Sequence, residues 1–197
     1  TRDPSSAASD VYKRQAKAAV AVTVDGVQKD LHDPIMQDSS VSIITIDSEE
    51  GLEIMRHTLT AQVLARAVKN LYPKSKLAIG PTIKDGFYYD VECDETISVD
   101  DLKNIEKEMD KIIKTKSSIT KKLLSKKDAL KVFKDKDESY KEEIINDSDQ
   151  ENEFQLYYQD DEDFVDLCKG PHLPSLNFIG AYKLTTISGA YWKGDSS

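Results

Sequence analysis

The stretch RHTLTAQVLARAVKNLYP, residues 56–73, carries the clearest secondary-structure signal in the chain. From Leu52 to Leu71, apolar residues recur at spacings of three and four, which is the period of one face of an α-helix. Pro73 marks the expected end, because proline cannot continue a helix. The pattern therefore predicts a long helix with one face packed on a core.

Outward from this helix, residues 77–83 and 87–93 flank Lys84-Asp85-Gly86 and predict a β-hairpin. Ser98 and Asp101 form a capping-box pair ahead of a second amphipathic helix. Further helices are expected at 125–133 and 140–145, and strands at 154–159, 163–168, 182–187 and 190–192. This order predicts an α+β fold with helices packed on an antiparallel sheet.

The residues before the first helix predict a separate small module. Residues 1–15 have neither helical nor strand periodicity, so we expect a disordered or non-native leader. Residues 19–31 predict strand, Asp25-Gly26 turn and strand, and residues 41–46 predict a third strand. With a linker expected at 47–51, the chain divides into a leader, a partial β-rich module at 16–48 and a larger domain at 49–197.

Composition excludes some classes of protein. No run of eighteen apolar residues predicts a membrane-spanning helix, and the N-terminal stretch lacks the apolar core of a signal peptide. Two cysteines, Cys93 and Cys168, are too few for a disulfide framework, so we expect a cytoplasmic protein. The net charge of −9 is unevenly placed, with nine lysines in 103–127. These lysines predict either a phosphate-binding patch or an ordinary solvated face.

The segment VDLCKGPHLP, residues 165–174, places Cys168 and His172 around a Gly-Pro pair that predicts a loop or sharp turn. A thiol and an imidazole can form a nucleophile–base pair, provide two ligands of a metal site, or simply line a packed polar pocket. Asp166 would share the face of Cys168 on a strand and adds a carboxylate. Of the other histidines, His32 is expected at the surface. His57 lies on the long helix without a second histidine on its face.

Several segments, in their order and separations, resemble bacterial threonyl-tRNA synthetase. These segments are RHTLTAQVLARAVKNLYP, LAIGPTIKDGFYYDVE, ESYKEEII, DFVDLCKGPHLPS and GAYWKGDS. The resemblance covers the editing (second additional) domain of that family from about Leu52 onward. Residues 24–57 resemble the C-terminal half of the small TGS domain that precedes it.

The resemblance implies an N-terminal fragment of a threonine-tRNA ligase that hydrolyses mischarged Ser-tRNA(Thr), with tRNA(Thr) as the partner. It implies no cofactor in this fragment, because ATP, magnesium and the active-site zinc belong to the catalytic core that the fragment lacks. A homodimer is expected only through that core. Related alanyl editing proteins hold zinc with a similar residue set whereas the threonyl domain works without it, so the metal content is left open.

The resemblance also assigns roles to residues. It implies a catalytic set of His57, Asp166, Cys168 and His172. Asp166 would orient His172 or hold the substrate ammonium group. Tyr89 would contact the terminal adenosine or the amino acid. Lys141 would neutralise phosphate or developing negative charge. The ordinary alternatives are a half-buried strand aromatic for Tyr89 and a surface lysine for Lys141.

One departure from the family pattern concerns the long helix. The family has His-x-x-x-His there, whereas this chain has one extra residue and Gln62 at the second histidine position. Aligned on the downstream residues, the first-histidine position falls on Thr58, one residue after His57. On a straight α-helix His57 and Gln62 lie roughly 140° apart, so only a bulge or a looped helix start would bring both into one pocket. The alternative function is therefore a non-catalytic tRNA-binding module with a decayed editing site.

Overall fold

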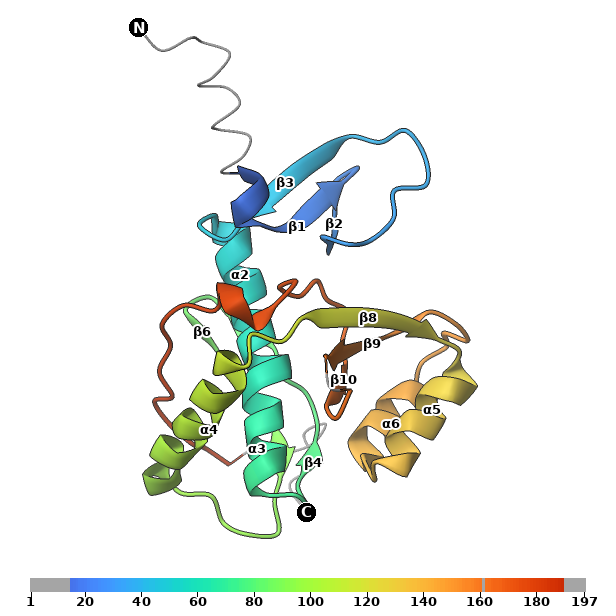
Figure 1. Cartoon of the computed structure of the whole chain (residues 1–197). Coiled ribbons are helices and arrows are strands. Elements are labelled where there is room, and N and C mark those ends of the chain that lie inside the picture. Colours follow the sequence, from blue (N-terminus) through green and yellow to red (C-terminus); the bar gives the residue numbers. More distant parts are fainter. Residues whose placement is uncertain (1–14, 161, 190–197) are drawn as a thin grey trace, which may run out of the picture.

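The computed structural model describes residues 15–160 and 162–189 (Figure 1). The leader expected at 1–15 lies, except for Gln15, outside these residues, as does the strand expected at 190–192. The described residues form helices and small antiparallel sheets, which confirms the predicted α+β class. None of the helices in the described part of the chain is both long enough and apolar enough to cross a membrane.

The N-terminal part is a three-stranded antiparallel sheet in the order β2-β1-β3, at one end of the molecule in Figure 1. Asp25 and Gly26 form the turn between β1 and β2 with positive φ angles of 49° and 83°, as expected for a tight hairpin. The strands are β1 (Ala19–Val24), β2 (Val27–Asp30) and β3 (Val41–Thr45). The predicted hairpin and third strand are therefore confirmed.

The long helix is continuous but changes its winding. It runs through α2 (Glu49–Thr58), a π-helical segment η1 (Leu59–Leu64) and α3 (Ala65–Leu71). The linker expected at 47–51 is wrong, because the Ser48 side chain accepts a hydrogen bond from the Gly51 N–H (3.0 Å) and caps a helix that begins at Glu49. All six residues of η1 are buried, so the altered winding lies inside the core.

The predicted second hairpin and second helix follow. The capping box is present, with the Ser98 N–H donating to Asp101 Oδ2 (2.8 Å). The elements are β4 (Lys76–Leu77), β5 (Thr82–Ile83), β6 (Gly86–Phe87), β7 (Val91–Glu92), η2 (Val99–Asp101) and α4 (Leu102–Lys114). Helix α4 packs on the long helix through a core that includes Leu59, Val63, Met109 and Ile112.

A second three-stranded antiparallel sheet, in the order β10-β9-β8, lies beside the helices. Helices α5 and α6 cover it through a core of Ala129, Phe133, Ile145 and Leu156. The elements are β8 (Ile119–Leu124), α5 (Lys126–Asp135), α6 (Ser139–Asn146), β9 (Phe154–Gln159), β10 (Val165–Leu167) and η3 (Leu176–Phe178).

The strand expected at 182–187 is wrong. This segment has no regular structure and is held on α4 instead. The Leu184 N–H donates to Glu106 Oε1 (2.8 Å) and Lys183 Nζ donates to Glu106 Oε2 (2.7 Å). These hydrogen bonds to a helix side chain replace the strand pairing that the β-branched residues suggested.

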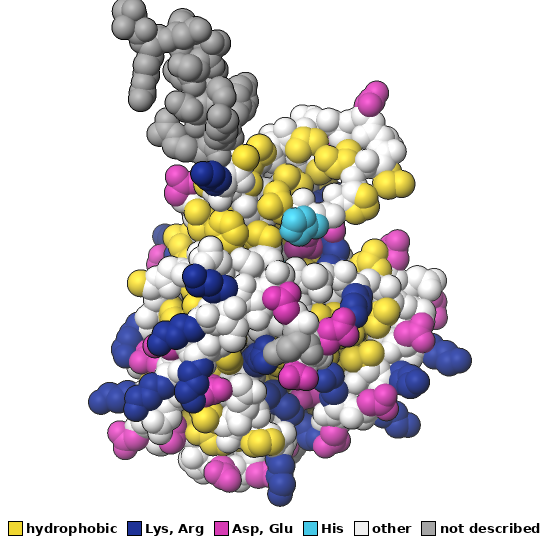
Figure 2. Space-filling view, viewed as in Figure 1, with side chains coloured by type: hydrophobic (Ala, Val, Ile, Leu, Met, Phe, Trp, Pro, Cys, Tyr) yellow, Lys and Arg dark blue, Asp and Glu magenta, His cyan; other side chains and the backbone are white. Residues whose placement is uncertain are grey.

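The lysine-rich segment 103–127 predicts either a phosphate-binding patch or an ordinary solvated face, and the surface charges distinguish the two. On the face in Figure 2, lysine and arginine side chains are interspersed with acidic ones over the larger domain. Apolar side chains gather over the N-terminal sheet on this face. Within the lysine-rich segment, Lys111 pairs with Glu108 and Lys122 pairs with Glu162, which favours an ordinary solvated face over a patch of one charge.

Candidate active site

The Cys168–His172 segment forms a sharp loop between β10 and η3, as predicted. Its Gly170-Pro171 peptide bond is cis, and Gly170 has φ +63°. Cys168 Sγ lies 2.8 Å from His172 Nε2. A side chain at position 170 would place its Cβ 1.9 Å from the Tyr157 hydroxyl, so only glycine lets the loop pack this closely on β9.

Thr58 of α2 fixes the orientation of His172. The Thr58 hydroxyl donates its single proton to Ile54 O (2.9 Å) and accepts from the Leu173 N–H (3.0 Å). It lies 3.1 Å from His172 Nδ1 and can only accept there, so Nδ1 carries the proton of the neutral imidazole. The lone pair of His172 is therefore on Nε2 and faces the thiol of Cys168.

His57 stacks on His172. The ring centroids are 4.5 Å apart and the rings are 21° from parallel. His57 Nδ1 lies 3.3 Å from Pro171 O, and because a carbonyl oxygen only accepts, Nδ1 is the donor. The lone pair of neutral His57 is thus on Nε2, for which the described residues supply no hydrogen-bond partner. The helix and the loop therefore bring His57, Cys168 and His172 together.

Burial keeps this cluster uncharged. Burial lowers the pKa of His57, and it lowers the pKa of His172 well below the usual value, with the nearby His57 adding to the effect. Burial, followed by the negative charge of Asp166, raises the pKa of the Cys168 thiol. The site thus holds two neutral imidazoles and a protonated thiol near neutral pH.

The buried side chains of Lys141 and Asp166 form a polar triad with the half-buried Tyr89 beside this cluster. Lys141 Nζ lies 2.6 Å from Asp166 Oδ1, and the two side chains are only 3% and 2% exposed. Lys141 also donates to the Tyr89 hydroxyl (3.0 Å), which donates to Asp166 Oδ2 (3.1 Å). Burial and the Asp166 carboxylate raise the pKa of Tyr89 well above its usual value. Lys141 is therefore not a surface lysine, and the hydrogen bonds of Asp166 within the described residues do not reach His172.

Gln62 lies in the π-helical segment and is fully buried. Gln159 Nε2 donates to the Gln62 backbone oxygen (2.8 Å), while Gln62 Nε2 has no hydrogen-bond partner in the described part of the chain. The i→i+5 hydrogen bonds of a π-helix, such as Ala65 N–H to Thr60 O, accommodate one extra residue. The helix thus contains a bulge of the kind considered from sequence, but no hydrogen bond among the described residues joins Gln62 to His57, Cys168 or His172.

Comparison with known proteins agrees with the earlier resemblance. Residues 155–197 match the family model of the threonyl and alanyl tRNA synthetase second additional domain. The chain is 46% identical over 181 residues to the threonine–tRNA ligase of Acidithiobacillus ferrooxidans and 47% identical over 182 residues to that of Legionella pneumophila. It is 46% identical over 190 residues to threonine–tRNA ligase 2 of Bacillus subtilis.

The chain is homologous to threonine–tRNA ligases. The alignments cover 92–96% of this chain but only 28–29% of the relatives, so the chain spans less than a third of their length. The family match covers β9, β10 and the Cys168–His172 loop, while its last eight residues, 190–197, lie outside the described part of the structure. The AYWKGD motif falls among those eight residues.

The cluster also offers three donors of two types that zinc prefers, imidazole nitrogen and thiol sulfur. One ligand atom each from His57, Cys168 and His172 lies within 4.8 Å of the others. One feature differs from the zinc-binding set of the related editing proteins: Gln62 stands where the resemblance has a second helix histidine, so the cluster offers three ligands, one fewer than that set. No step proposed below depends on a metal.

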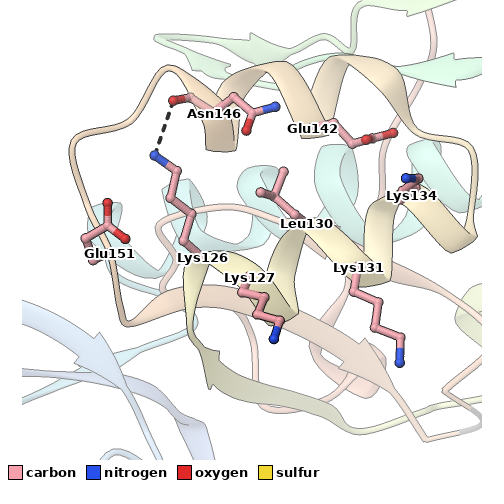
Figure 3. Close-up of a pocket in the computed structure, with 8 residues that line it drawn as sticks. All are labelled: Lys126, Lys127, Leu130, Lys131, Lys134, Glu142, Asn146 and Glu151. Atoms are coloured by element: carbon pink, nitrogen blue, oxygen red, sulfur yellow. Dashed lines mark hydrogen bonds between the residues drawn. The ribbon is translucent and has the colours of Figure 1, made fainter.

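A pocket of about 570 Å³ between α5 and α6 is separate from the cluster (Figure 3). Lys126 reaches across it to the backbone oxygen of Asn146 (3.2 Å). Its charged lining residues are Lys126, Lys127, Lys131, Lys134, Glu142 and Glu151. Its lining contains neither histidine nor cysteine, so it lacks the imidazole and thiol groups that the cluster offers.

Sequence reasoning missed three residues that contact His172, namely Thr58, Asp30 and Tyr157. Asp30 of β2 accepts a hydrogen bond from the His172 backbone N–H (2.9 Å), and the Tyr157 ring meets the His172 ring edge-on at 4.4 Å. His32, two residues after Asp30, is exposed as expected. The only local signal at Asp30 is a carboxylate at the end of a strand, which does not identify a partner 142 residues away.

Proposed function

We propose that this chain hydrolyses the ester bond of Ser-tRNA(Thr) and so serves as the editing part of a threonine–tRNA ligase. The observation that carries the proposal is the stacked His57–His172 pair beside Cys168, in which the His172 Nε2 lone pair faces the thiol and the His57 Nε2 lone pair has no partner among the described residues. The homology to threonine–tRNA ligases and the second-additional-domain match support the same assignment.

Such an activity has a physical reason in this family. Serine lacks one methyl group of threonine, and a binding pocket gains only about 1–3 kcal/mol from such a group, or roughly 10–200-fold in selectivity. Faithful decoding needs more, so a second site must remove the wrong product. In this proposal the editing pocket rejects threonine because the additional methyl clashes there.

In the proposed reaction, water attacks the carbonyl carbon of the seryl ester while a base takes a proton from it. The bond between that carbon and the ribose oxygen then breaks, and the ribose oxygen leaves as a hydroxyl with the proton that the base returns. We assign the base role to His57, because its Nε2 lone pair has no competing hydrogen bond within the described residues, whereas His172 Nε2 faces Cys168. Burial keeps His57 neutral, so the lone pair is available near neutral pH. His172, held in place beside Cys168, provides the ring on which His57 stacks.

Lys141 is the proposed partner for negative charge. An ammonium group has three N–H donors, and Asp166 and Tyr89 occupy two of them. The third has no partner among the described residues and can donate to a substrate oxygen as negative charge develops there. In this scheme Tyr89 and Asp166 hold Lys141 in place, and Tyr89 lies at the substrate side.

The test is a deacylation assay with the chain, Ser-tRNA(Thr) and Thr-tRNA(Thr). The proposal predicts that the seryl ester is hydrolysed faster than in buffer and that the threonyl ester is not. The alternative, a tRNA-binding module with a decayed site, is favoured by the buried Gln62 at the second histidine position. It predicts salt-dependent tRNA binding without hydrolysis of either ester.

A further inference from the structure

Asp30, the last residue of β2, links the N-terminal sheet to the candidate active site. Its Oδ1 accepts from the His172 backbone N–H (2.9 Å). Its Oδ2 accepts from the Tyr157 hydroxyl (2.7 Å) and lies 2.9 Å from Lys121 Nζ. One carboxylate thus joins the catalytic loop, β9 and β8, and hydrogen bonds to an ionised acceptor are stronger than neutral ones.

Two of these contacts act on the same imidazole. The His172 ring contacts Cys168 and His57, and the hydrogen bond to the His172 backbone N–H fixes the backbone position from which that ring extends. The Tyr157 ring supports the His172 ring edge-on at 4.4 Å. The Tyr157 hydroxyl also lies where a Cβ on Gly170 would be, which means that the loop rests directly on the group that Asp30 holds.

The support behind Asp30 is itself packed. Leu173, next to His172, is fully buried in a core with Val20, Ala21 and Ile44 of the N-terminal sheet and Ile54 of α2. The sheet therefore contacts the loop in two ways: it packs on the side chain of Leu173, and Asp30 accepts a hydrogen bond from the His172 backbone N–H. Displacement of β2 would release both the His172 N–H and the Tyr157 hydroxyl.

We propose that Asp30 is a positioning residue through which the N-terminal three-stranded sheet holds the His172 loop in the geometry needed for deacylation. The proposal builds on the function proposed above and assigns the small module a part in it. Asp30 does not touch the substrate in this scheme. It acts through the His172 backbone and the Tyr157 hydroxyl.

The matched control is Asp33, which pairs with the same Lys121 (2.6 Å) but, among the described residues, has no hydrogen bond to His172 or Tyr157. Asp30→Ala, Asp30→Asn and Asp33→Ala are compared in the full chain, with thermal unfolding as a check on folding. Asn keeps an oxygen that can accept from the His172 N–H, so it is the conservative rescue of Ala. Two readouts are measured: single-turnover and steady-state deacylation of Ser-tRNA(Thr), and hydrogen exchange of the His172 amide.

Asp30→Ala is expected to lower kcat by about 10–100-fold with little change in KM, because it disturbs positioning and not binding. The His172 amide is expected to exchange at least about tenfold faster. Asp30→Asn should recover part of both effects, and Asp33→Ala should stay within about twofold of the unsubstituted chain. Equal effects of Asp30→Ala and Asp33→Ala, or unchanged exchange in Asp30→Ala, would overturn the proposal.

The exchange readout separates this inference from the proposed function. If the unsubstituted chain does not hydrolyse Ser-tRNA(Thr), the proposed function fails, and Asp30 then has no part in deacylation. Faster exchange at His172 in Asp30→Ala alone would then still establish the structural link. If the unsubstituted chain is active and Asp30→Ala retains full kcat, only the role of Asp30 fails.

Discussion

Replacing Thr58 by valine tests the tautomer of His172, because it removes one buried hydroxyl while keeping the volume of the side chain. The hydroxyl accepts from the Leu173 N–H at 3.0 Å and from His172 Nδ1 at 3.1 Å, and Thr58 is fully buried. Each buried donor left without a partner costs about 1–3 kcal/mol. Thr58→Val should therefore lower the free energy of unfolding by about 2–6 kcal/mol.

The control is Thr58→Ser, which keeps the hydroxyl and loses only a buried methyl, with an expected cost of about 1 kcal/mol. Urea unfolding measures both variants, and ¹⁵N NMR of the imidazole identifies the protonated nitrogen of His172. The unsubstituted chain and Thr58→Ser should show a proton on Nδ1, and Thr58→Val should lose this preference. A proton on Nε2 in the unsubstituted chain, or equal unfolding energies for the two variants, would refute the assignment.

Three further predictions concern the buried ion pair, pH and the helix. Lys141→Met leaves Asp166 buried without a counter-charge and should lower the free energy of unfolding, measured in urea, by about 3–5 kcal/mol. The double variant Lys141→Met with Asp166→Leu should regain most of this loss. A double variant no more stable than Lys141→Met would contradict a buried ion pair. The folded-state pKa of His172 lies below that of the unfolded chain, so the unfolded state binds more protons as pH falls below about 6.5. The free energy of unfolding should decline there by up to about 1.4 kcal/mol per pH unit. His172→Gln should reduce this slope, and an unchanged slope in urea titrations contradicts the pKa shift. Deleting Leu59 together with Gln62→His restores the His-x-x-x-His spacing. We expect the deacylation rate of this variant to lie within about tenfold of the rate of the unsubstituted chain. A rate more than about a hundredfold higher would instead support the decayed-site alternative.

Much of the fold follows from local patterns. Apolar spacing predicted the long helix, and the Asp25-Gly26 turn and the Ser98–Asp101 capping box were correctly predicted. The helix start at Glu49 was missed because residues 47–51 looked like a polar linker, although Ser48 followed by two glutamates is also a cap signal. Strand β8 was not predicted, since its lysine-rich sequence gains its structure from pairing with β9.

The site was only partly accessible from sequence. The Cys168–His172 loop and its meeting with His57 follow from the motif and the resemblance, but the contacts that orient His172 come from distant segments. Thr58 is 114 residues from His172, and Asp30 is 142 residues away, so no local spacing reveals either contact. Similarly, a helical pattern cannot distinguish α from π winding within Leu59–Leu64, because that choice depends on how the extra residue packs in the core.

The most direct test of the proposed function is single-turnover hydrolysis of Ser-tRNA(Thr) by the full chain and by His57→Gln. Glutamine keeps a polar side chain at this position but cannot act as a base near neutral pH. The proposal predicts hydrolysis by the unsubstituted chain at a rate about 10²–10⁴-fold above that of His57→Gln. A rate for the unsubstituted chain equal to that of His57→Gln, or to that of buffer alone, would contradict it.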